Sequence, residues 1–143
     1  MDSNFLDLFA GSGAIGIEAL SRGAKSCVFI ENDSAACSLI RRNLEKTRLG
    51  KNAQTINSDA KKAICNMRQK FDIIFADPPY SQNLVNIILS DIAEWDLLSE
   101  NGFIVIEISK KDELPEDFLQ TIGLSIFKHK KYSSTQLIFI EKA

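Results

Sequence analysis

Cysteine and histidine are scarce in this chain of 143 residues, which holds three cysteines and one histidine. The cysteines, Cys27, Cys37 and Cys65, are odd in number and show no C-x-x-C spacing. This usage predicts reduced thiols in a cytoplasmic protein and disfavours a disulfide framework. With His129 as the single histidine, it also predicts that the chain has no metal site.

Long apolar runs, repeats and an excess of positive charge are also missing. No apolar run is long enough to span a membrane, so we expect no membrane partner. The first ten residues predict no signal peptide, because they lack a basic start and a small-residue cleavage site. The net charge is −2, so the overall charge of the chain does not support nucleic-acid binding. The remaining composition, 45% hydrophobic and 25% charged, is typical of one globular domain over residues 1–143.

The chain is organised around a glycine-rich turn, Asp7-Leu8-Phe9-Ala10-Gly11-Ser12-Gly13-Ala14-Ile15-Gly16. An apolar strand precedes the turn, and a helix is expected to begin at Ala14. Gly11 and Gly13 permit positive φ angles and leave the backbone open to a ligand. The free N–H groups at a helix start favour an anionic or polar ligand. The turn therefore predicts a nucleotide cofactor, although its G-x-G-x-x-G pattern also occurs in dinucleotide dehydrogenases and in ligand-free turns.

Apolar runs and helical patterns alternate along the chain. Runs that are apolar throughout are typical of strands covered on both faces of a parallel sheet, and we expect such strands over 5–9, 27–30, 53–57, 71–76 and 103–108. Helices are expected over 14–22, 34–48, 60–67, 84–95 and 115–121, with Leu39 on the inner face of the second. A closing antiparallel hairpin is expected over 124–127 and 136–140. The order predicts an α/β, three-layer Rossmann-like fold whose ligand lies beyond the carboxyl ends of the strands.

Acidic residues lie at the predicted strand ends. Glu31, 20 residues after Gly11, has the spacing of a carboxylate that accepts hydrogen bonds from both ribose hydroxyls of a nucleoside. Asp59 can accept from an adenine amino group, or it can simply cap the next helix. Asp7 is an acid within an apolar strand. Its burial is unfavourable unless hydrogen bonds to the glycine turn or to a ligand's ammonium group compensate it.

The segment Asp77-Pro78-Pro79-Tyr80 follows the most apolar predicted strand. Two prolines fix φ and remove two donors, which exposes carbonyl groups in a rigid arc. Asp77 and a nearby carbonyl can together accept two hydrogen bonds from an exocyclic amine, and Asp77 can take the proton that the nitrogen loses. Tyr80 offers a face on which an extruded base can stack. These four residues, Asp77, Pro78, Pro79 and Tyr80, form the predicted catalytic group.

These motifs together resemble the class I S-adenosylmethionine-dependent amino-methyltransferases. Within that class, the runs 5–19, 20–24 and 71–80 and the tail after Lys131 are similar to the RsmD family. That family methylates the exocyclic amine of a guanine in 16S ribosomal RNA. The resemblance implies a seven-stranded sheet in the order 3-2-1-4-5-7-6 with an antiparallel strand seven. It also implies a segment before the first strand, which we expect this chain to lack.

The resemblance also implies a cofactor, a partner and residue roles. S-adenosylmethionine is the expected methyl donor, and 16S ribosomal RNA or the small ribosomal subunit is the expected partner. Asp7 and the glycine turn would hold the methionine part of the cofactor, Glu31 the ribose, and Asp59 with Ala60 the adenine. Asp77 and Tyr80 would hold the guanine. The full expected cofactor-binding set is Asp7, Ala10, Gly11, Ser12, Gly13, Glu31, Asn32, Asp59 and Ala60.

Other functions stay open from the sequence. Asp-Pro-Pro-Tyr is shared with adenine and cytosine amino-methylases, so a DNA or RNA adenine amino-methyltransferase is one alternative. A nicotinamide-dependent oxidoreductase would use the glycine turn and Glu31 but would leave 77–80 without a role. A non-catalytic RNA-binding module is a third. Lys128, Lys130 and Lys131, beside Tyr132, form a local basic patch that either contacts phosphates or is a solvated surface.

Overall fold

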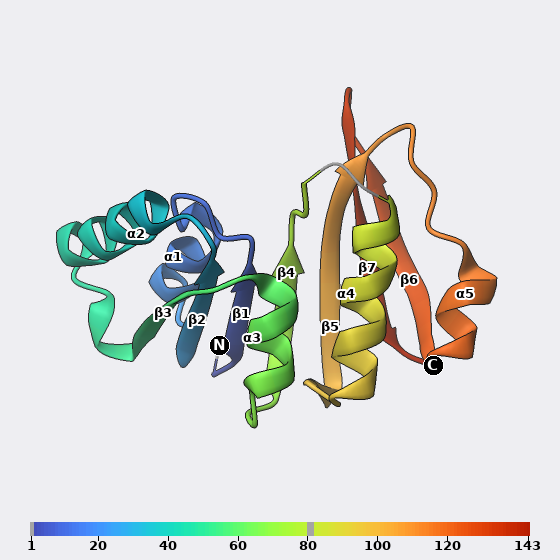
Figure 1. The fold of residues 1–143 in the computed structure, drawn as a ribbon, viewed down its shortest axis with the longest axis horizontal. Coiled ribbons are helices and arrows are strands. Elements are labelled where there is room, and N and C mark those ends of the chain that lie inside the picture. Colours follow the sequence, from blue (N-terminus) through green and yellow to red (C-terminus); the bar gives the residue numbers. More distant parts are fainter. Residues whose placement is uncertain (1, 80–81) are drawn as a thin grey trace.

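A computed structural model of the chain describes residues 2–79 and 82–143 (Figure 1). Strands and helices alternate up to the fifth strand, and an antiparallel hairpin closes the chain, as the sequence predicts. The elements are β1 (Asn4–Leu8), α1 (Ala14–Ser21), β2 (Ser26–Glu31), α2 (Ser34–Thr47), the 3-10 turn η1 (Gly50–Asn52), β3 (Ala53–Asn57), α3 (Ala60–Asn66), β4 (Phe71–Ala76), α4 (Gln82–Glu94), β5 (Leu98–Ser109), α5 (Glu116–Thr121), β6 (Leu124–Lys131) and β7 (Thr135–Lys142).

All seven strands form one sheet in the order β3-β2-β1-β4-β5-β7-β6. The first five strands are parallel to one another, and β7 runs antiparallel between β5 and β6. The expected three-layer α/β fold and its strand order are therefore confirmed. Because the parallel strands end at one edge, the segments after β1, β2, β3 and β4 lie along that edge, where ligands of such sheets bind.

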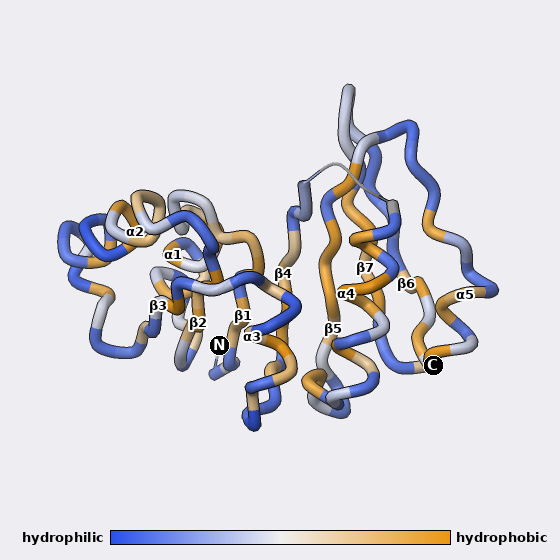
Figure 2. The backbone as a smooth tube through the Cα atoms, in the orientation of Figure 1, coloured by the Kyte–Doolittle hydropathy of each residue, from blue (hydrophilic) through white to orange (hydrophobic). Residues whose placement is uncertain are grey.

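Two hydrophobic cores cover the two faces of the sheet. The larger core packs α3, α4 and α5 against one face, and its fully buried residues include Leu6, Ile74 and Ile104. The smaller core packs α1 and α2 against the other face around Phe29 and Ile40. Each such side chain contributes about 1.5–3 kcal/mol when it is buried. Figure 2 shows the result, with hydrophobic segments along the central strands and hydrophilic ones in the connecting loops.

The structure corrects three details of the sequence analysis. Strand β5 begins at Leu98, not at Phe103, because its first residue pairs with Phe71 before the register shifts. Strand β6 continues through the basic residues to Lys131, since cross-strand bonds to β7 need no apolar side chains. Leu39 is 37% exposed, and Cys37 occupies the buried face of α2 in its place.

Cys27 and Cys37 are buried, Cys65 is partly exposed, and all three are free thiols. Within the described ranges, no helix combines the length and the apolar character that crossing a membrane requires.

Candidate active site

Four carboxylates lie on one face of the sheet at its carboxyl edge. Asp7 in β1 pairs in register with Phe29 of β2 and Phe75 of β4, and Phe75 pairs with Val105 of β5. Side chains two residues apart on a strand point to the same face. Two positions after these three partners, Phe29, Phe75 and Val105, the residues are Glu31, Asp77 and Glu107, which are all acidic. The sheet therefore aligns three acids above a fourth.

Asp7 is the buried member of this group, with 1% of its surface exposed. The pKa of its carboxyl group is raised from 3.8 to about 7, chiefly by burial; a hydrogen bond from Gly16 lowers it, and the charges of Asp77 and Glu31 add to the rise. That bond joins the backbone N–H of Gly16 to Asp7 Oδ2 at 3.1 Å. The site therefore has an excess of negative charge, which a cationic ligand would relieve.

The glycine turn leaves β1 in a left-handed conformation. Phe9, Gly11 and Gly13 have φ angles of 57°, 58° and 82°, and the turn is held by bonds from Ala10 N to Ile30 O (2.9 Å) and from Gly13 N to Ala10 O (2.8 Å). A Cβ on Gly11 would meet no atom within 4 Å, so the backbone faces open space there. The expected approach surface for a ligand is thus present at Gly11.

Glu31 fixes this turn from the end of β2. Its Oε1 accepts a hydrogen bond from Gly11 N at 2.8 Å, and its Oε2 accepts one from Asp33 N at 2.9 Å. A carboxylate has further lone pairs on both oxygens, so both remain able to accept from ribose hydroxyls. Glu31 also lines a shallow crevice whose walls are Phe9, Ile30, Glu31, Asn32, Ser58, Asp59 and Ala60.

Asp59 caps a helix, as the sequence predicts, and it also lines the crevice. Its Oδ2 accepts from Lys62 N at 3.2 Å, which caps α3. The backbone N–H of Ser58 donates to Glu31 O at 3.0 Å and ties the ends of β2 and β3 together. Four predicted cofactor-binding residues, Glu31, Asn32, Asp59 and Ala60, therefore meet in this crevice.

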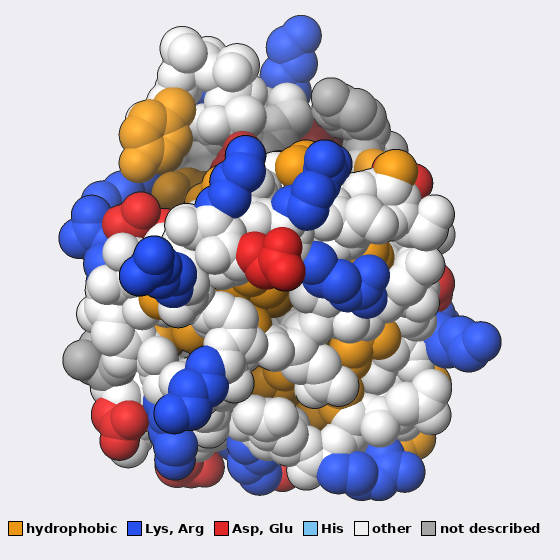
Figure 3. Space-filling model, turned by 90° about the vertical axis from the view of Figure 1, so that its left-hand side faces the viewer, with side chains coloured by type: hydrophobic (Ala, Val, Ile, Leu, Met, Phe, Trp, Pro, Cys, Tyr) orange, Lys and Arg blue, Asp and Glu red, His pale blue; other side chains and the backbone are white. Residues whose placement is uncertain are grey.

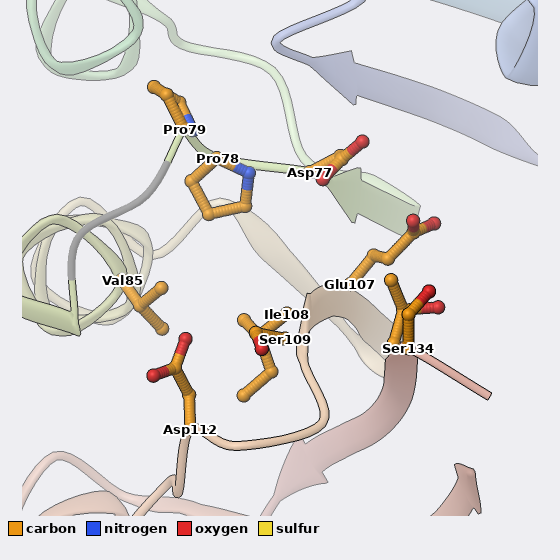
Figure 4. Close-up of a pocket in the computed structure, with 10 residues that line it drawn as sticks. Asp77, Pro78, Pro79, Val85, Glu107, Ile108, Ser109, Asp112 and Ser134 are labelled. Atoms are coloured by element: carbon orange, nitrogen blue, oxygen red, sulfur yellow. The ribbon is translucent and has the colours of Figure 1, made fainter. Parts of the chain in front are cut away.

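Asp77 lies on the wall of a separate, larger cavity of about 490 Å³ (Figure 4). Pro78 and Pro79 line it beside Asp77, and Tyr80 falls outside the described residues. The opposite wall comes from the end of β5, the loop after it and the β6–β7 turn; its residues are Glu107, Ile108, Ser109, Asp112, Ser134 and Thr135. Burial raises the pKa of Asp77 and of Glu107, and for Glu107 the charge of Asp77 adds to the effect.

The crevice and the cavity share no lining residue, so Glu31 and Asp77 line two separate hollows. Asp7 connects them electrostatically, because both Glu31 of the crevice and Asp77 of the cavity act on its pKa. A ligand that reached from one hollow to the other would pass over Asp7 and the open face of Gly11.

Glu107 and Asn43 are among the residues of the site that were missed from the sequence. Glu107 lies within an apolar strand just as Asp7 does, and the same rule about buried acids would have found it. Asn43 gave no such signal, since its Nδ2 reaches across to Ser12 O at 3.0 Å from the middle of α2. In the part of the chain that the structure describes, no group of three or more His, Cys, Asp or Glu side chains is arranged to hold a metal ion.

The donor set of the site fits S-adenosylmethionine. Its cationic ammonium and sulfonium groups match the negative charge at Asp7 and its neighbours, and its hydroxyl groups match the accepting oxygens of Glu31. Within the glycine turn, which contains Ala10, Gly11, Ser12 and Gly13, the backbone at Gly11 is open to a ligand.

Comparison with known proteins shows the family of this chain. The family model described as Conserved hypothetical protein 95 matches residues 1–141. The chain is 40% identical over 141 residues to "Putative rRNA methyltransferase YlbH" of Bacillus subtilis, covering 96% of this chain and 74% of that protein. It is 34% identical over 115 residues to "Ribosomal RNA small subunit methyltransferase D" of Escherichia coli K12, covering 80% of this chain but only 58% of that protein.

Solved structures agree on the fold. A conserved hypothetical protein of Streptococcus pyogenes aligns with a TM-score of 0.91 at 32% identity, over 99% of this chain and 87% of the other. The mitomycin 7-O-methyltransferase MmcR aligns with a TM-score of 0.78 at 14% identity, over 99% of this chain and 49% of the other. The architecture is therefore the class I methyltransferase fold.

Proposed function

The chain belongs to the family described as Conserved hypothetical protein 95, and from that premise we propose that it transfers a methyl group from S-adenosylmethionine to the exocyclic amine of a guanine in 16S ribosomal RNA. The proposal extends to this chain what the name of the Escherichia coli relative states, ribosomal RNA of the small subunit as substrate. The guanine amine comes from the resemblance of 71–80 to the RsmD family.

One observation carries the proposal, namely that Glu31 and Asp77 lie two residues beyond the register partners of Asp7 on the two strands beside β1. When bound, S-adenosylmethionine supplies an electrophilic methyl group on a positively charged sulfur. Asp7 offers a charge partner to the cationic part of the cofactor, and Glu31 offers acceptors to its ribose. Asp7 and Glu31 would thus hold the cofactor beside the end of β1, between the crevice and the strand that leads to Asp77.

Asp77 acts on the substrate side. Its carboxylate accepts a hydrogen bond from the exocyclic amine and takes the proton that the nitrogen loses as the new N–C bond forms. The methyl–sulfur bond breaks in the same displacement, and its electron pair stays on the sulfur of the S-adenosylhomocysteine that leaves. The raised pKa of Asp77 makes it a better proton acceptor than an ordinary surface aspartate. Pro78 and Pro79, which have no backbone N–H, leave the cavity wall beside it rich in acceptors, and these suit an amine donor.

A methylation assay tests the proposal. It uses labelled S-adenosylmethionine as methyl donor and small ribosomal subunits that lack RNA methylation as substrate. We expect the label in one guanine amine, located by mapping the modified base, and we expect Asp77→Asn to abolish it. A labelled adenine would favour the adenine amino-methyltransferase alternative. Absence of label with wild-type protein, in which S-adenosylhomocysteine binding is intact, would favour a non-catalytic RNA-binding module. Binding of NADH in place of S-adenosylhomocysteine would favour the oxidoreductase.

A further inference from the structure

The tip of the β6–β7 hairpin lies next to the cavity of Asp77. Residues 132–134 join the two strands, and Ser134 and Thr135 line the cavity opposite Pro78. In Figure 1 the hairpin reaches past the carboxyl edge of the parallel strands, and Figure 4 shows Ser134 on the cavity wall below Glu107. Whatever enters the cavity from this side must pass the hairpin tip.

A buried glutamine fixes the tip in this position. Gln136 is 3% exposed, and its Nε2 donates to Ser109 O at 3.0 Å and to Asp112 O at 2.6 Å. Its Oε1 is hydrogen-bonded to His129 Nε2 of the neighbouring strand. The backbone N–H of Lys110 also donates to Ser134 O at 3.0 Å. The hairpin and the loop after β5 are therefore held together as one rim of the cavity.

The rim and the cavity carry opposite charges. Asp77, Glu107 and Asp112 line the cavity, so a phosphate would be repelled there while a neutral, amine-bearing base would find acceptors. At the tip, Lys130 and Lys131 are exposed, and neither forms an ion pair with any described residue. Tyr132 follows them directly and leaves 51% of its surface exposed. An aromatic ring beside two free cations is the combination that binds single-stranded nucleic acid.

We propose that the hairpin tip docks the single-stranded RNA that flanks the target nucleotide, with Tyr132 stacked on a neighbouring base and Lys130 and Lys131 on phosphates. The inference rests on the proposed function, since it assumes an RNA substrate. A single strand is favoured over a duplex because stacking needs an unpaired base and the cavity needs an extruded one. Both needs are met when the target base turns into the cavity and its neighbour stacks at the rim.

A second basic hollow provides a matched control. Arg48 and Lys51 line a groove of about 460 Å³ between α2 and β3, on the face that Figure 3 shows with Lys and Arg side chains spread over it. Strands β3 and β6 are the opposite edges of the sheet, so this groove lies far along the sheet from the hairpin. Arg48→Gln/Lys51→Gln removes as much charge as Lys130→Gln/Lys131→Gln does.

The test measures binding of a fluorescein-labelled, single-stranded 16S ribosomal RNA fragment by fluorescence anisotropy over a range of salt concentrations. We expect Tyr132→Ala to weaken binding about 5-fold to 100-fold, and Tyr132→Phe to preserve it. We expect Lys130→Gln/Lys131→Gln to lower the slope of log affinity against log salt by roughly 1.4, about 0.7 for each lysine. Calorimetry with S-adenosylhomocysteine should give the wild-type affinity for every variant, which verifies the fold.

Several outcomes would overturn the inference. Unchanged RNA affinity in Tyr132→Ala would show that Tyr132 does not stack on a base. If only Arg48→Gln/Lys51→Gln lowered the slope of log affinity against log salt, the RNA would bind at the α2 face and not at the hairpin tip. Tip variants that bind RNA normally but fail to methylate assembled subunits would show that the tip contacts a protein. In each of these cases wild-type methylation of small subunits leaves the proposed function standing. If the wild-type protein neither binds RNA nor methylates, the proposed function fails first and the inference with it.

Discussion

Glu31 Oε1 accepts a hydrogen bond of 2.8 Å from the backbone N–H of Gly11, which lies 20 residues earlier in the chain. The same carboxylate accepts a second bond, from Asp33 N. A single side chain at the end of β2 thus sets the shape of the turn after β1 and faces the crevice where we expect the ribose. Loss of this carboxylate is therefore expected to affect both the turn and the binding of the cofactor.

We expect Glu31→Ala to weaken S-adenosylhomocysteine binding by about 1–3 kcal/mol, because it removes charged acceptors from both the turn and the ribose. Isothermal titration calorimetry measures the affinity. Glu18→Ala is the control, since Glu18 is an exposed acid on α1 that pairs only with Arg22 among the described residues. An affinity in Glu31→Ala equal to that of the control would remove Glu31 from the site.

For Asp77→Asn we expect methyl transfer to be lost while the cofactor affinity changes by less than about 1 kcal/mol, because Asp77 acts on the base and not on the cofactor. Single-turnover transfer and calorimetry measure the two effects. Asp117→Asn, an exposed change on α5, should leave both at the wild-type level. If Asp77→Asn transferred methyl groups at the full rate, another group would have to accept the proton.

Asp7 makes the stability of the cofactor-free protein depend on pH. Because its pKa rises from 3.8 to about 7 on folding, the folded state holds a proton that the unfolded state releases. Stability therefore falls as pH rises from about 4 to 7, and stays at the lower value above that. At about 1.4 kcal/mol for each pH unit between the two pKa values, Asp7→Asn should gain roughly 4–5 kcal/mol at pH 8.

Denaturant unfolding at pH 8 and at pH 4 measures this gain, which should nearly vanish at the lower pH. An equal gain at both values would mean that asparagine packs better and that ionisation plays no part. The same variant should bind S-adenosylhomocysteine with an affinity that no longer rises with pH near 7, since the ionised carboxylate is the form that attracts the ligand's ammonium group.

Gly16→Ala should destabilise the fold by about 1–3 kcal/mol, through overpacking between α1 and β2. A Cβ at this position would lie 2.7 Å from Cys27 Sγ and would collide with the Phe29 ring. Gly50→Ala is the matched control, because its nearest neighbour would be Leu44 Cβ at 3.9 Å. Thermal unfolding measures the stability of the two variants. Equal unfolding midpoints would show that α1 can move away from β2 and make room for the added methyl group.

Most of the fold could be predicted from the sequence, because a strand that is buried on both faces is apolar throughout. β3 and β4 begin and end where the sequence predicts, at 53–57 and 71–76. The start of β5 was wrong because Asn101-Gly102 indicates a helix end, whereas Gly102 in fact packs against the backbone of Asp72, a contact distant in sequence. The basic part of β6 gave no strand signal, since an edge strand exposed to water needs no apolar side chains.

The same reasoning applies to the site. The acids at strand ends and the glycine turn were predictable, because each departs from the pattern of the element around it. Ser134 and Thr135, which close the cavity of Asp77, were not, since the antiparallel return of β7 brings them there from 57 or more residues away. Their contribution depends on sheet order and not on any local signal.

The two outer strands of the sheet, β3 and β6, also bear on how molecules of this chain meet one another. Arg41 Nη2 donates to the backbone carbonyl of Thr55 at 3.5 Å and occupies part of the open margin of β3. Lys128, Lys130 and Lys131 line the open margin of β6. Strands that approached either margin from a second molecule would meet like charge, so lateral growth into fibres is disfavoured at both ends.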